Sequence, residues 1–561
     1  MSKSTLIRTL QQACHIARAS IKTGISPAEL LGMFREKVSR RRLLQGSLAL
    51  ASTVTTASFF RNGHLSAKAA GTPILIVGAG IAGLTAAYRL KQYGIAVDII
   101  EARMAVGGRI RTFPKAAGTL NLAELGGEYI NTSHTCIRTL AAELGLQEVD
   151  LVATQQGLIQ DTYYFQGRRI SLEEILNDFV PLAAQIDKDL STIGNQLSYK
   201  FFTPEAQRLD NISIAEYLEK VPTTSLVRNL FRIAYTIEYG REPEEQSALN
   251  LLFLVGTETD ELNLFGDSDE RYQIAGGNNQ IISKLAELLA GAIEIGTVLE
   301  ALAILPDGRY RVSLRAGEST FDRIYERVVL TIPFSVLRQI QINVPLPPAK
   351  RQAINTLGYG TNSKFISGYR ERIWRTRYGS TASIFTDLPL QNTWEATPFY
   401  PGPDGLVTNF VGGRQGLLLG SGTPLEQLQR IQPQYEQIFP GISSVLTGQA
   451  IRVFWPGERY SQGSYSCYLV GQWTKFYGVE GERVGNLFFA GEHCSLENQG
   501  YMEGGCETGE IAAAEILQDL GLGAEGAQLL LRMKNNRQYR RPPSRRLPQQ
   551  RWQPTRHQIA V

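Results

Sequence analysis

The hydrophobic and polar positions of residues 74–101 predict a strand, a glycine turn, a helix and a second strand. Ile74–Val77 is a continuous apolar run, which is typical of a strand buried on both faces. Ala82–Leu90 continues with a helical pattern, and a second apolar run, Val97–Ile100, ends at Glu101. This order predicts a βαβ unit of a parallel sheet.

Three glycines occupy the turn between the first strand and the helix. Gly78, Gly80 and Gly83 form G-x-G-x-x-G: the first permits a tight turn, the second lets backbone approach a pyrophosphate, and the third lets helix pack on strand. Amide groups at the helix start, around Ala82, point at the phosphates. Glu101 stands 18 residues after Gly83, where a carboxylate accepts hydrogen bonds from ribose hydroxyls. The segment therefore predicts a dinucleotide site.

The residues after this unit indicate which dinucleotide binds. Gly107-Gly108-Arg109 keeps small residues and an arginine near the phosphates, which suits a large, permanently held cofactor, and 125–129 adds a second glycine pair. With these motifs the chain resembles the flavin-dependent amine oxidases, a family that includes monoamine oxidases, polyamine oxidases and L-amino acid oxidases. The resemblance implies FAD and assigns to its binding Gly108, Arg109, Gly126, Gly127, Glu128 and Tyr129.

The expected fold class is α/β, with a Rossmann-like FAD-binding domain of the glutathione-reductase kind. The resemblance implies that this domain is assembled from about 70–135, 270–335 and 485–522. Residues 136–269 are expected to form a largely helical insertion, with amphipathic runs such as Ile212–Leu218. Residues 336–484 mix short strands, aromatics and turns, as a mixed-sheet substrate domain does. Later elements expected in the FAD-binding domain are a helix at Gln280–Leu289, strands at Ile293–Leu299, Arg327–Ile332 and Leu487–Ala490, and a helix at Thr508–Leu520.

Charge is unevenly spread along the 561 residues. The net charge is +4, but residues 1–69 and residues 532–561 each carry +9, which leaves about −14 for the body between them. An acidic body does not support nucleic-acid binding. The Arg-, Pro- and Gln-rich tail at 532–561 is expected to be disordered.

The first 69 residues have the features of an export signal. Ser39–Leu44 matches a twin-arginine pattern, a weakly apolar run follows at Leu43–Phe60, and Ala67-Lys68-Ala69 resembles a cleavage site. Polar residues interrupt the run, so no transmembrane segment is expected after processing. The twin-arginine route exports folded, cofactor-loaded proteins, so we expect a periplasmic or extracellular flavoprotein.

Five cysteines are spread along the chain, at Cys14, Cys136, Cys467, Cys494 and Cys506. Because they form no C-x-x-C or Cys/His cluster, no metal site is expected. The sequence leaves open whether any of them form disulfides in an exported protein. It also leaves open whether the protein is a homodimer.

The resemblance also implies roles for three residues around the flavin. Val298 occupies the position whose backbone contacts the adenine. Lys364 follows Tyr359-Gly360 at the family spacing, where a lysine holds a water beside flavin N5; a cation there stabilises the charge that develops as oxygen is reduced. Trp455 matches the tryptophan that packs near that lysine.

Two tyrosines match the aromatic cage of monoamine oxidases. Tyr465 and Tyr501 stand at the two wall positions, where parallel rings hold the substrate nitrogen over the flavin. Ser464 falls where monoamine oxidases place the cysteine that bonds covalently to the flavin. Since a serine cannot form that thioether, we expect non-covalent FAD.

The segment 487–517 is the most specific match to the family. Glu492 is placed to bind the ribityl chain, and Met502 offers its backbone N–H to a flavin carbonyl. The helix that opens at 500–504 points its N-terminus at the flavin pyrimidine, where the helix dipole stabilises the anionic reduced ring.

The residues after the second glycine pair favour an amine over an amino acid. L-amino acid oxidases place an arginine there to hold the carboxylate, but this chain has Glu128-Tyr129-Ile130-Asn131. Polyamine oxidases place a carboxylate nearby for a distant ammonium; Asn131 does not supply it, and Glu128 is out of register. An arginine from the insertion stays open, the candidates being Arg168, Arg232 and Arg241.

The sequence therefore predicts an FAD-dependent amine oxidase that yields a carbonyl compound, ammonia and hydrogen peroxide with O2 as acceptor. The catalytic candidates are Lys364, Trp455, Tyr465 and Tyr501. Three alternatives stay open: an L-amino acid oxidase, a flavin desaturase or porphyrinogen-type oxidase, and a non-enzymatic flavin-binding protein.

Overall fold

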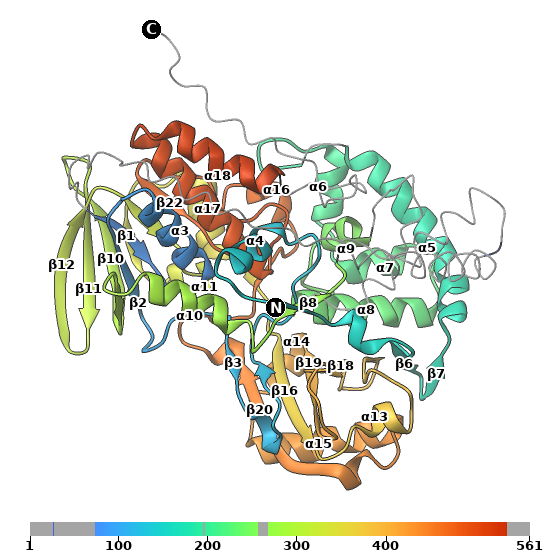
Figure 1. Ribbon diagram of the computed structural model, residues 1–561. Coiled ribbons are helices and arrows are strands. Elements are labelled where there is room, and N and C mark those ends of the chain that lie inside the picture. The colour runs from blue at the N-terminus through green and yellow to red at the C-terminus, as the bar shows by residue number, and fades with distance from the viewer. Residues whose placement is uncertain (1–25, 27–72, 195–196, 256–267, 536–561) are drawn as a thin grey trace.

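The computed structural model describes residues 26, 73–194, 197–255 and 268–535, and a five-stranded parallel sheet lies in its upper left part in Figure 1. Its strand order is β22-β13-β1-β2-β9, and every pairing is parallel. Three distant parts of the chain supply the strands β1 (Ile74–Val77), β2 (Val97–Glu101), β9 (Ile293–Ile295), β13 (Val328–Leu330) and β22 (Leu487–Phe489). The predicted α/β class is confirmed. The expected leader, its cleavage site and most of the basic tail lie outside the described residues.

Alternate side chains of β1 enter different hydrophobic cores, as expected for a strand covered on both faces. Ile74 and Ile76 pack in the core beneath the helices, whereas Leu75 and Val77 pack in the core on the other side. The covering helices are α3 (Ile81–Gln92), α4 (Thr135–Glu143), α10 (Asn279–Leu288), α17 (Met502–Asp519) and α18 (Gly523–Asn535).

Two strands form where the sequence pattern predicts one. The expected strand Ile293–Leu299 is interrupted at Gly296, whose φ of +69° turns the chain. The first part is β9 of the parallel sheet, and the second joins a separate four-stranded sheet of order β12-β11-β10-β14. That sheet contains β10 (Thr297–Ile304), β11 (Tyr310–Ala316), β12 (Ser319–Tyr325) and β14 (Gln341–Asn343), with α11 (Phe334–Leu337) between its last strands.

A seven-stranded mixed sheet forms the lower part of the molecule in Figure 1. Its order is β20-β16-β19-β18-β17-β6-β7, and helix α15 (Pro424–Ile438) packs on it. Five strands come from the expected substrate domain: β16 (Ser363–Tyr369), β17 (Ile384–Thr386), β18 (Asn392–Glu395), β19 (Gly405–Val411) and β20 (Leu446–Phe454). The other two, β6 (Thr162–Phe165) and β7 (Arg168–Ile170), come from the insertion that the sequence predicts as largely helical.

Short elements connect these layers. Two-residue strand pairs join β3 (Thr112–Phe113) to β4 (Ala123–Glu124) and β15 (Gly358–Tyr359) to β21 (Ser466–Cys467). Strand β5 (Glu148–Asp150) pairs with β8 (Tyr272–Ile274). The remaining short helices are α12 (Pro348–Thr356), α13 (Ile373–Thr376), α14 (Gly413–Leu418) and α16 (Trp473–Phe476).

The helices between residues 172 and 255 of the insertion lie to the right in Figure 1, whereas its first residues belong to α4 and β5. Most of the helices on the right begin at side chains that accept from N-terminal amides, as Ser213 does for Glu216. The amphipathic run predicted at Ile212–Leu218 overlaps α7 from Ile214 onward. These helices are α5 (Leu172–Ile193), α6 (Pro204–Asp210), α7 (Ile214–Lys220), α8 (Ser225–Tyr239) and α9 (Ala248–Val255). None of the helices in the described ranges combines the length and apolar character needed to cross a bilayer.

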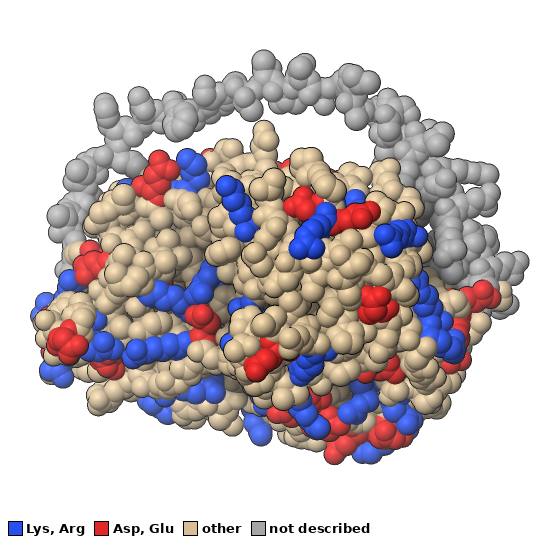
Figure 2. Space-filling model, turned by 90° about the horizontal axis from the view of Figure 1, so that it is seen from below, with Lys and Arg blue, Asp and Glu red and all other residues tan. Residues whose placement is uncertain are grey.

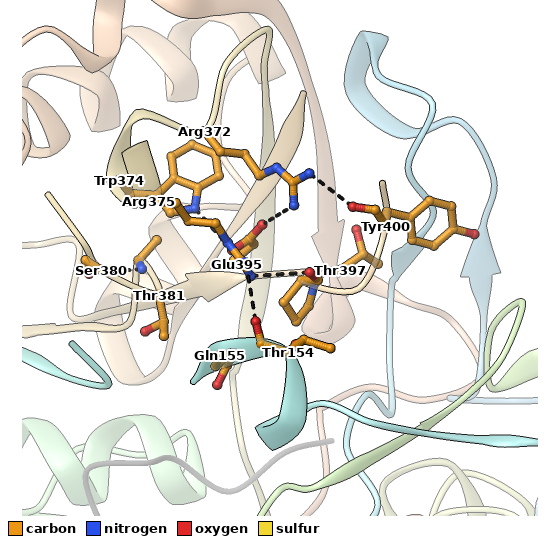
Figure 3. Close-up of polar contacts among 12 residues, drawn as sticks. Thr154, Gln155, Arg372, Trp374, Arg375, Ser380, Thr381, Glu395, Thr397 and Tyr400 are labelled. Carbon is orange, nitrogen blue, oxygen red and sulfur yellow. Dashed lines mark hydrogen bonds and ion pairs between the residues drawn. The ribbon is translucent and has the colours of Figure 1, made fainter. Parts of the chain in front are cut away.

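A buried carboxylate fixes one loop of the seven-stranded sheet (Figure 3). Glu395, at the end of β18, accepts from Arg372 at 3.2 Å and from Arg375 at 2.5 Å. The Arg372 guanidinium also donates to the carbonyl oxygen of Tyr400 at 3.0 Å. The loop at 396–404 is therefore held by the same two arginines that neutralise Glu395, an arrangement that satisfies a buried charge.

Acidic and basic side chains are interspersed on the face seen in Figure 2. Ion pairs occur between described residues, for example between Arg138 and Glu148 at 2.9 Å and between Arg271 and Asp150 at 2.6 Å.

Candidate functional site

The glycine turn after β1 has the geometry that its sequence predicts. Gly78 has a φ of +108°, which favours glycine. A Cβ on Gly83 would lie 2.0 Å from the carbonyl oxygen of Gly78, so α3 contacts the turn through bare backbone. A Cβ on Gly80 would meet nothing within 4 Å. The first and third glycines are thus needed for packing, and the second faces open space.

That open space belongs to a cavity of about 290 Å³ that reaches from Glu101 and Val298 to the start of α17. Helices α3 and α17 both begin in its wall, and neither first turn has a side-chain cap. Their N-terminal amides are therefore available to a ligand, as a pyrophosphate and an electron-rich ring require. A long cavity with bare backbone at Gly80 and helix starts at two places fits a bound dinucleotide.

Most of the predicted cofactor-binding residues line this cavity: Gly78, Gly80, Ala82, Glu101, Gly108, Arg109, Val298, Glu492, Tyr501 and Met502. Five others, namely Gly83, Gly126, Gly127, Glu128 and Tyr129, are not among its lining residues. Gly126 instead supports the wall from behind, because its Cβ would lie 1.8 Å from the carbonyl oxygen of Arg109.

Several lining residues carry no motif and were missed in the sequence: Arg103, Arg315, Thr331, Gln339, Ser461 and Gln462. They come from strand ends and loops that only the fold brings together. Thr331, after β13, donates through its hydroxyl to the carbonyl oxygens of Val77 and Gly78 at 2.8 and 3.1 Å. It therefore fixes the glycine turn from the neighbouring strand.

Glu101 has two backbone partners at the end of β2. Its carboxylate accepts from the N–H of Ala79 at 3.0 Å and from the N–H of Arg103 at 2.9 Å. The side chain thus ties the first glycine loop to the segment that leads to Gly107 and Gly108. This contact orients the carboxylate at the rim of the cavity, where the predicted ribose contact requires it.

An ion pair joins the first and last segments of the parallel-sheet domain. Arg109 donates to Glu492 Oε1 at 2.9 Å and to the carbonyl oxygen of Ser464 at 2.8 Å. Glu492 also accepts from the N–H of Gly500 at 2.9 Å. Burial by itself would raise the pKa of Glu492, but Arg109 and its other partners outweigh burial and hold the pKa below its usual value. Glu492 is therefore ionised in the cavity wall.

Lys364, on β16, is buried against Glu128. Its Nζ lies 2.6 Å from Glu128 Oε2 and donates to the carbonyl oxygen of Gly126 at 2.9 Å. The other oxygen of Glu128 accepts from the indole N–H of Trp394 at 2.8 Å. The ammonium predicted to hold a water is thus ion-paired to a residue that the sequence assigned to the cofactor.

Trp455 lies on the other side of the same glycine pair. Its ring edge is 3.2 Å from the position of a Cβ on Gly126, whose carbonyl oxygen accepts from Lys364. The Arg111 guanidinium lies over the indole, 5.3 Å from its centroid. Trp455 and Lys364 therefore both contact Gly126, which a larger residue would not permit.

The two predicted cage tyrosines both lie next to Gly500, one in space and one in the chain. A Cβ on Gly500 would lie 3.3 Å from the ring of Tyr465, and Tyr501 is the next residue in the chain. The Tyr465 hydroxyl donates to the carbonyl oxygens of Glu238 and, at 3.3 Å, of Ile237. The Tyr501 ring packs edge-on against His134 with centroids 4.8 Å apart. Tyr501 lines the cavity, and Tyr465 stands behind Gly500.

Burial keeps both phenols neutral. Burial is the main cause that raises the pKa of Tyr465 and of Tyr501 well above the usual value, and the carboxylate of Glu238 adds to it in each case. Glu238 lies beside Tyr465, whose hydroxyl donates to its backbone carbonyl oxygen. Glu270, with 9% of its surface exposed, also raises the pKa of Tyr501.

Comparison with known proteins identifies the architecture. Residues 81–517 match the model of the flavin containing amine oxidoreductases. The flavin-containing amine oxidase of Oncorhynchus mykiss is 28% identical over 462 residues, which cover 80% of this chain and 86% of that protein. The human flavin-containing amine oxidase B is 27% identical over 466 residues, again 80% and 86%.

The chain belongs to the flavin-containing amine oxidoreductase family.

Solved structures agree with this assignment at the level of the fold. Cyclohexylamine oxidase from Brevibacterium oxydans superimposes with a TM-score of 0.69 at 22% identity, covering 80% of this chain and 99% of that one. Putrescine oxidase with bound putrescine gives 0.67 at 21% identity and the same coverage. The protein is thus a flavin-dependent enzyme of the amine oxidase type.

The insertion of this amine oxidase contains three arginines that are candidate ligands of a substrate carboxylate, and each of them forms an ion pair with a glutamate. Arg168 pairs with Glu174, Arg232 with Glu244 and Arg241 with Glu245. Asn131, one of the four residues that stand where L-amino acid oxidases place an arginine, binds the protein itself: it accepts from the N–H of Glu270 at 2.9 Å and donates to Ser268 at 3.1 Å. These contacts do not supply a bidentate cation for an amino acid carboxylate.

Proposed function

We propose that this enzyme is an oxidase of amines that holds FAD non-covalently in a glutathione-reductase-like domain. The observation that carries the proposal is the pair of neutral tyrosines at Gly500, one in the cavity wall and one behind it. The overall reaction converts an amine, O2 and water into a carbonyl compound, ammonia and hydrogen peroxide. When bound, the flavin accepts hydride from the carbon next to the amine nitrogen and returns the electrons to O2.

The residues around the tyrosines orient and desolvate the amine. Tyr465 is fixed by its hydrogen bond to Glu238, and Tyr501 by His134 and the start of α17. Two aromatic faces favour a nitrogen with developing positive charge. Both phenols stay protonated, so the substrate nitrogen must arrive unprotonated and needs no side-chain base.

Charged groups near the cavity have separate roles. Lys364 brings a cation beside the second glycine pair, and Glu128 keeps it fixed at 2.6 Å. A preorganised ammonium stabilises charge on reduced oxygen without solvent rearrangement. Arg109 and Glu492 hold the cofactor wall, and the bare N-terminus of α17 offers the N–H of Met502 to an electron-rich ring.

Ser464 supports non-covalent attachment. Its hydroxyl is buried and donates to the side-chain oxygen of Asn362 at 2.6 Å. A serine hydroxyl cannot form the thioether through which monoamine oxidases hold their flavin. Precipitation of the holoenzyme with acid should therefore leave the yellow colour in the supernatant; colour retained in the protein pellet would contradict this part of the proposal.

Diamines are the second candidate substrates, because two carboxylates stand by the tyrosines. Glu238 and Glu270 are buried, and both raise the pKa of Tyr501, so acidic groups that could attract a second ammonium act on this side of the cavity. Putrescine oxidase, which shares the fold, was solved with putrescine. Glu238→Gln should then raise the KM of diamines by ten-fold or more and leave the KM of a monoamine of equal length nearly unchanged.

Anaerobic bleaching of the bound flavin tests the proposal as a whole. Monoamines, diamines and L-amino acids are mixed in turn with the oxidised holoenzyme under nitrogen. The loss of the visible absorbance band of the oxidised flavin is then followed. Amines should bleach the flavin and amino acids should not. Bleaching by amino acids alone would establish the L-amino acid oxidase alternative, and no bleaching by any compound would support the desaturase or non-enzymatic alternatives.

We also propose that the enzyme is exported by the twin-arginine route, on the strength of Ser39–Leu44 and the following apolar run. Peroxide would then be made outside the cytoplasm. Replacement of Arg40 and Arg41 by lysine should leave active enzyme in the cytoplasmic fraction. Unchanged distribution between cell fractions would contradict export by this route.

A further inference from the structure

Two cysteines that are 370 residues apart in sequence meet between α4 and α17. Cys136 Sγ lies 3.1 Å from Cys506 Sγ, and both side chains are buried. The other two cysteines in the described residues, Cys467 and Cys494, are also buried, and their sulfur atoms contact backbone carbonyls. Among the four cysteines of the described residues, Cys136 and Cys506 are therefore the two whose sulfur atoms contact each other.

A carboxylate fixes the pair in register. Glu503 accepts from the N–H of Cys136 and from the N–H of Ile137, each at 2.8 Å, and so caps the start of α4. Cys506 follows Glu503 by three residues on α17, which puts both side chains on the same face of that helix. The Glu503 carboxylate thus joins α17 to the start of α4 and keeps the two sulfur atoms close to each other.

We infer that Cys136 and Cys506 form a disulfide in the working enzyme, through oxidation by hydrogen peroxide. Two S–H bonds break, one S–S bond forms, and one molecule of peroxide is reduced to two of water. A disulfide has a sulfur–sulfur distance of about 2.05 Å, so the sulfurs must approach by about 1 Å. Gly505, next to Cys506, lines the cofactor cavity, where the reaction proposed above would release peroxide; that source of oxidant rests on the proposed function.

A metal ion fits this place less well than a crosslink. Cys136, Cys506 and Glu510 have donor atoms within 4.8 Å of one another. However, Glu510 Oε1 already accepts two hydrogen bonds from Arg89, at 2.9 and 2.7 Å. A cation would therefore lie beside a positively charged guanidinium. The hydrogen bond that Cys136 donates to Cys506 and burial both raise the pKa of Cys136 well above its usual value, which disfavours metal binding and also slows oxidation of this thiol at neutral pH.

The crosslink would tie α4 to the helix that starts at the cofactor cavity. Tyr501 and Met502 begin α17, one turn before Cys506. A covalent link between 136 and 506 closes a very long loop and removes many unfolded conformations. The oxidised enzyme should therefore melt at a higher temperature and lose flavin more slowly than the reduced enzyme.

Peptide mapping of the holoenzyme tests the inference directly. The enzyme is reduced with dithiothreitol, desalted, divided, and treated with hydrogen peroxide or buffer before unfolding, alkylation and digestion. We expect one crosslinked peptide containing Cys136 and Cys506 only after peroxide, formed faster at higher pH because thiolate is the reactive form. Peroxide is added, so the result does not depend on amine turnover; flavin bleaching scores the proposed function separately.

Three variants sharpen the test. Cys136→Ala and Cys506→Ala should each abolish the crosslinked peptide and make the melting temperature independent of dithiothreitol. Cys494→Ser, in which the hydroxyl replaces the thiol beside the carbonyl of Glu480, should retain the crosslink. Full alkylation of both cysteines after peroxide, sulfinic acid at either one without a crosslink, or zinc retained in stoichiometric amount by the reduced enzyme would overturn the inference.

Discussion

The ammonium of Lys364 and the carboxylate of Glu128 lie 2.6 Å apart with no more than 1% of either side chain exposed. Each charge is satisfied by the other and by further partners, so the pair is costly to break from one side. Because Lys364 comes from the seven-stranded sheet and Glu128 follows the second glycine pair, the contact also fixes how the two domains meet.

The first prediction concerns this pair. Lys364→Met should lower the free energy of unfolding by about 3–5 kcal/mol, because Glu128 is left buried and unpaired. The double variant Lys364→Met with Glu128→Gln should recover much of the lost stability. Its reduced form should still react with O2 about 100-fold more slowly than the reduced wild type does, because the cation is absent. Urea unfolding and stopped-flow reoxidation measure the two effects. A double variant that regains the oxygen rate would show that Lys364 is only structural.

The second prediction separates two glycines of one motif. Gly83→Ala should prevent folding, because the new methyl would lie 2.0 Å from the carbonyl oxygen of Gly78. Gly80→Ala should fold with a near-normal melting temperature but bind FAD at least ten-fold more weakly, because its methyl enters the cavity. Circular dichroism and flavin titration of the apoprotein distinguish them. Equal behaviour of the two variants would contradict the assignment.

The third prediction concerns the two tyrosines. Tyr465→Phe should destabilise the protein by about 1–3 kcal/mol, because the buried carbonyl of Glu238 loses its donor. Tyr501→Phe should cost less, because its hydroxyl has a longer bond of 3.5 Å to Ser268. Leucine at either position should lower kcat/KM for an amine by about 10–30-fold. If both leucine variants keep normal kcat/KM, the rings do not form a substrate cage.

The fourth prediction concerns the pH dependence of turnover. Since both phenols have a raised pKa, neither ionises in the working range, and the protonation state of the free amine governs binding. kcat/KM should rise about ten-fold per pH unit below the substrate pKa and level off there. Two amines of different pKa should give profiles displaced by that difference. Profiles that coincide would assign the ionisation to the enzyme.

The fifth prediction concerns acid stability. Burial lowers the pKa of His493 to about 4 from 6.5, and neither ring nitrogen has a hydrogen-bond partner among the described residues. Between pH 6.5 and 4 the unfolded chain therefore binds a proton that the folded chain does not, so stability is lost as the pH falls through this window, by up to about 3 kcal/mol.

His493→Phe should remove that loss, since the ring packs edge-on against Phe334 with centroids 4.4 Å apart and needs no polar partner. The urea unfolding midpoint of the wild type and of the variant is measured at about pH 4.5, 5.5 and 6.5. The slope of the midpoint against pH is then compared between the two proteins. An identical slope in the two proteins would assign the acid loss to other groups.

The sequence alone determined the βαβ unit. Ile74–Val77, the three glycines and Glu101 all lie within residues 74–101, so the turn, the helix start and the strand ends are fixed by local sequence. The family resemblance added residues such as Arg109, Glu492 and Tyr501, all of which line the cavity.

Only the tertiary structure decided which of these side chains meet. The partner of Lys364, the sulfur contact of Cys136 with Cys506, and the transfer of β6 and β7 to the seven-stranded sheet all join segments far apart in the chain. Gly296 split the expected strand Ile293–Leu299 into strands of two sheets, because its positive φ turns the chain there. Contacts of this kind depend on how whole layers pack, and hydrophobic patterns record only which face of each element is buried.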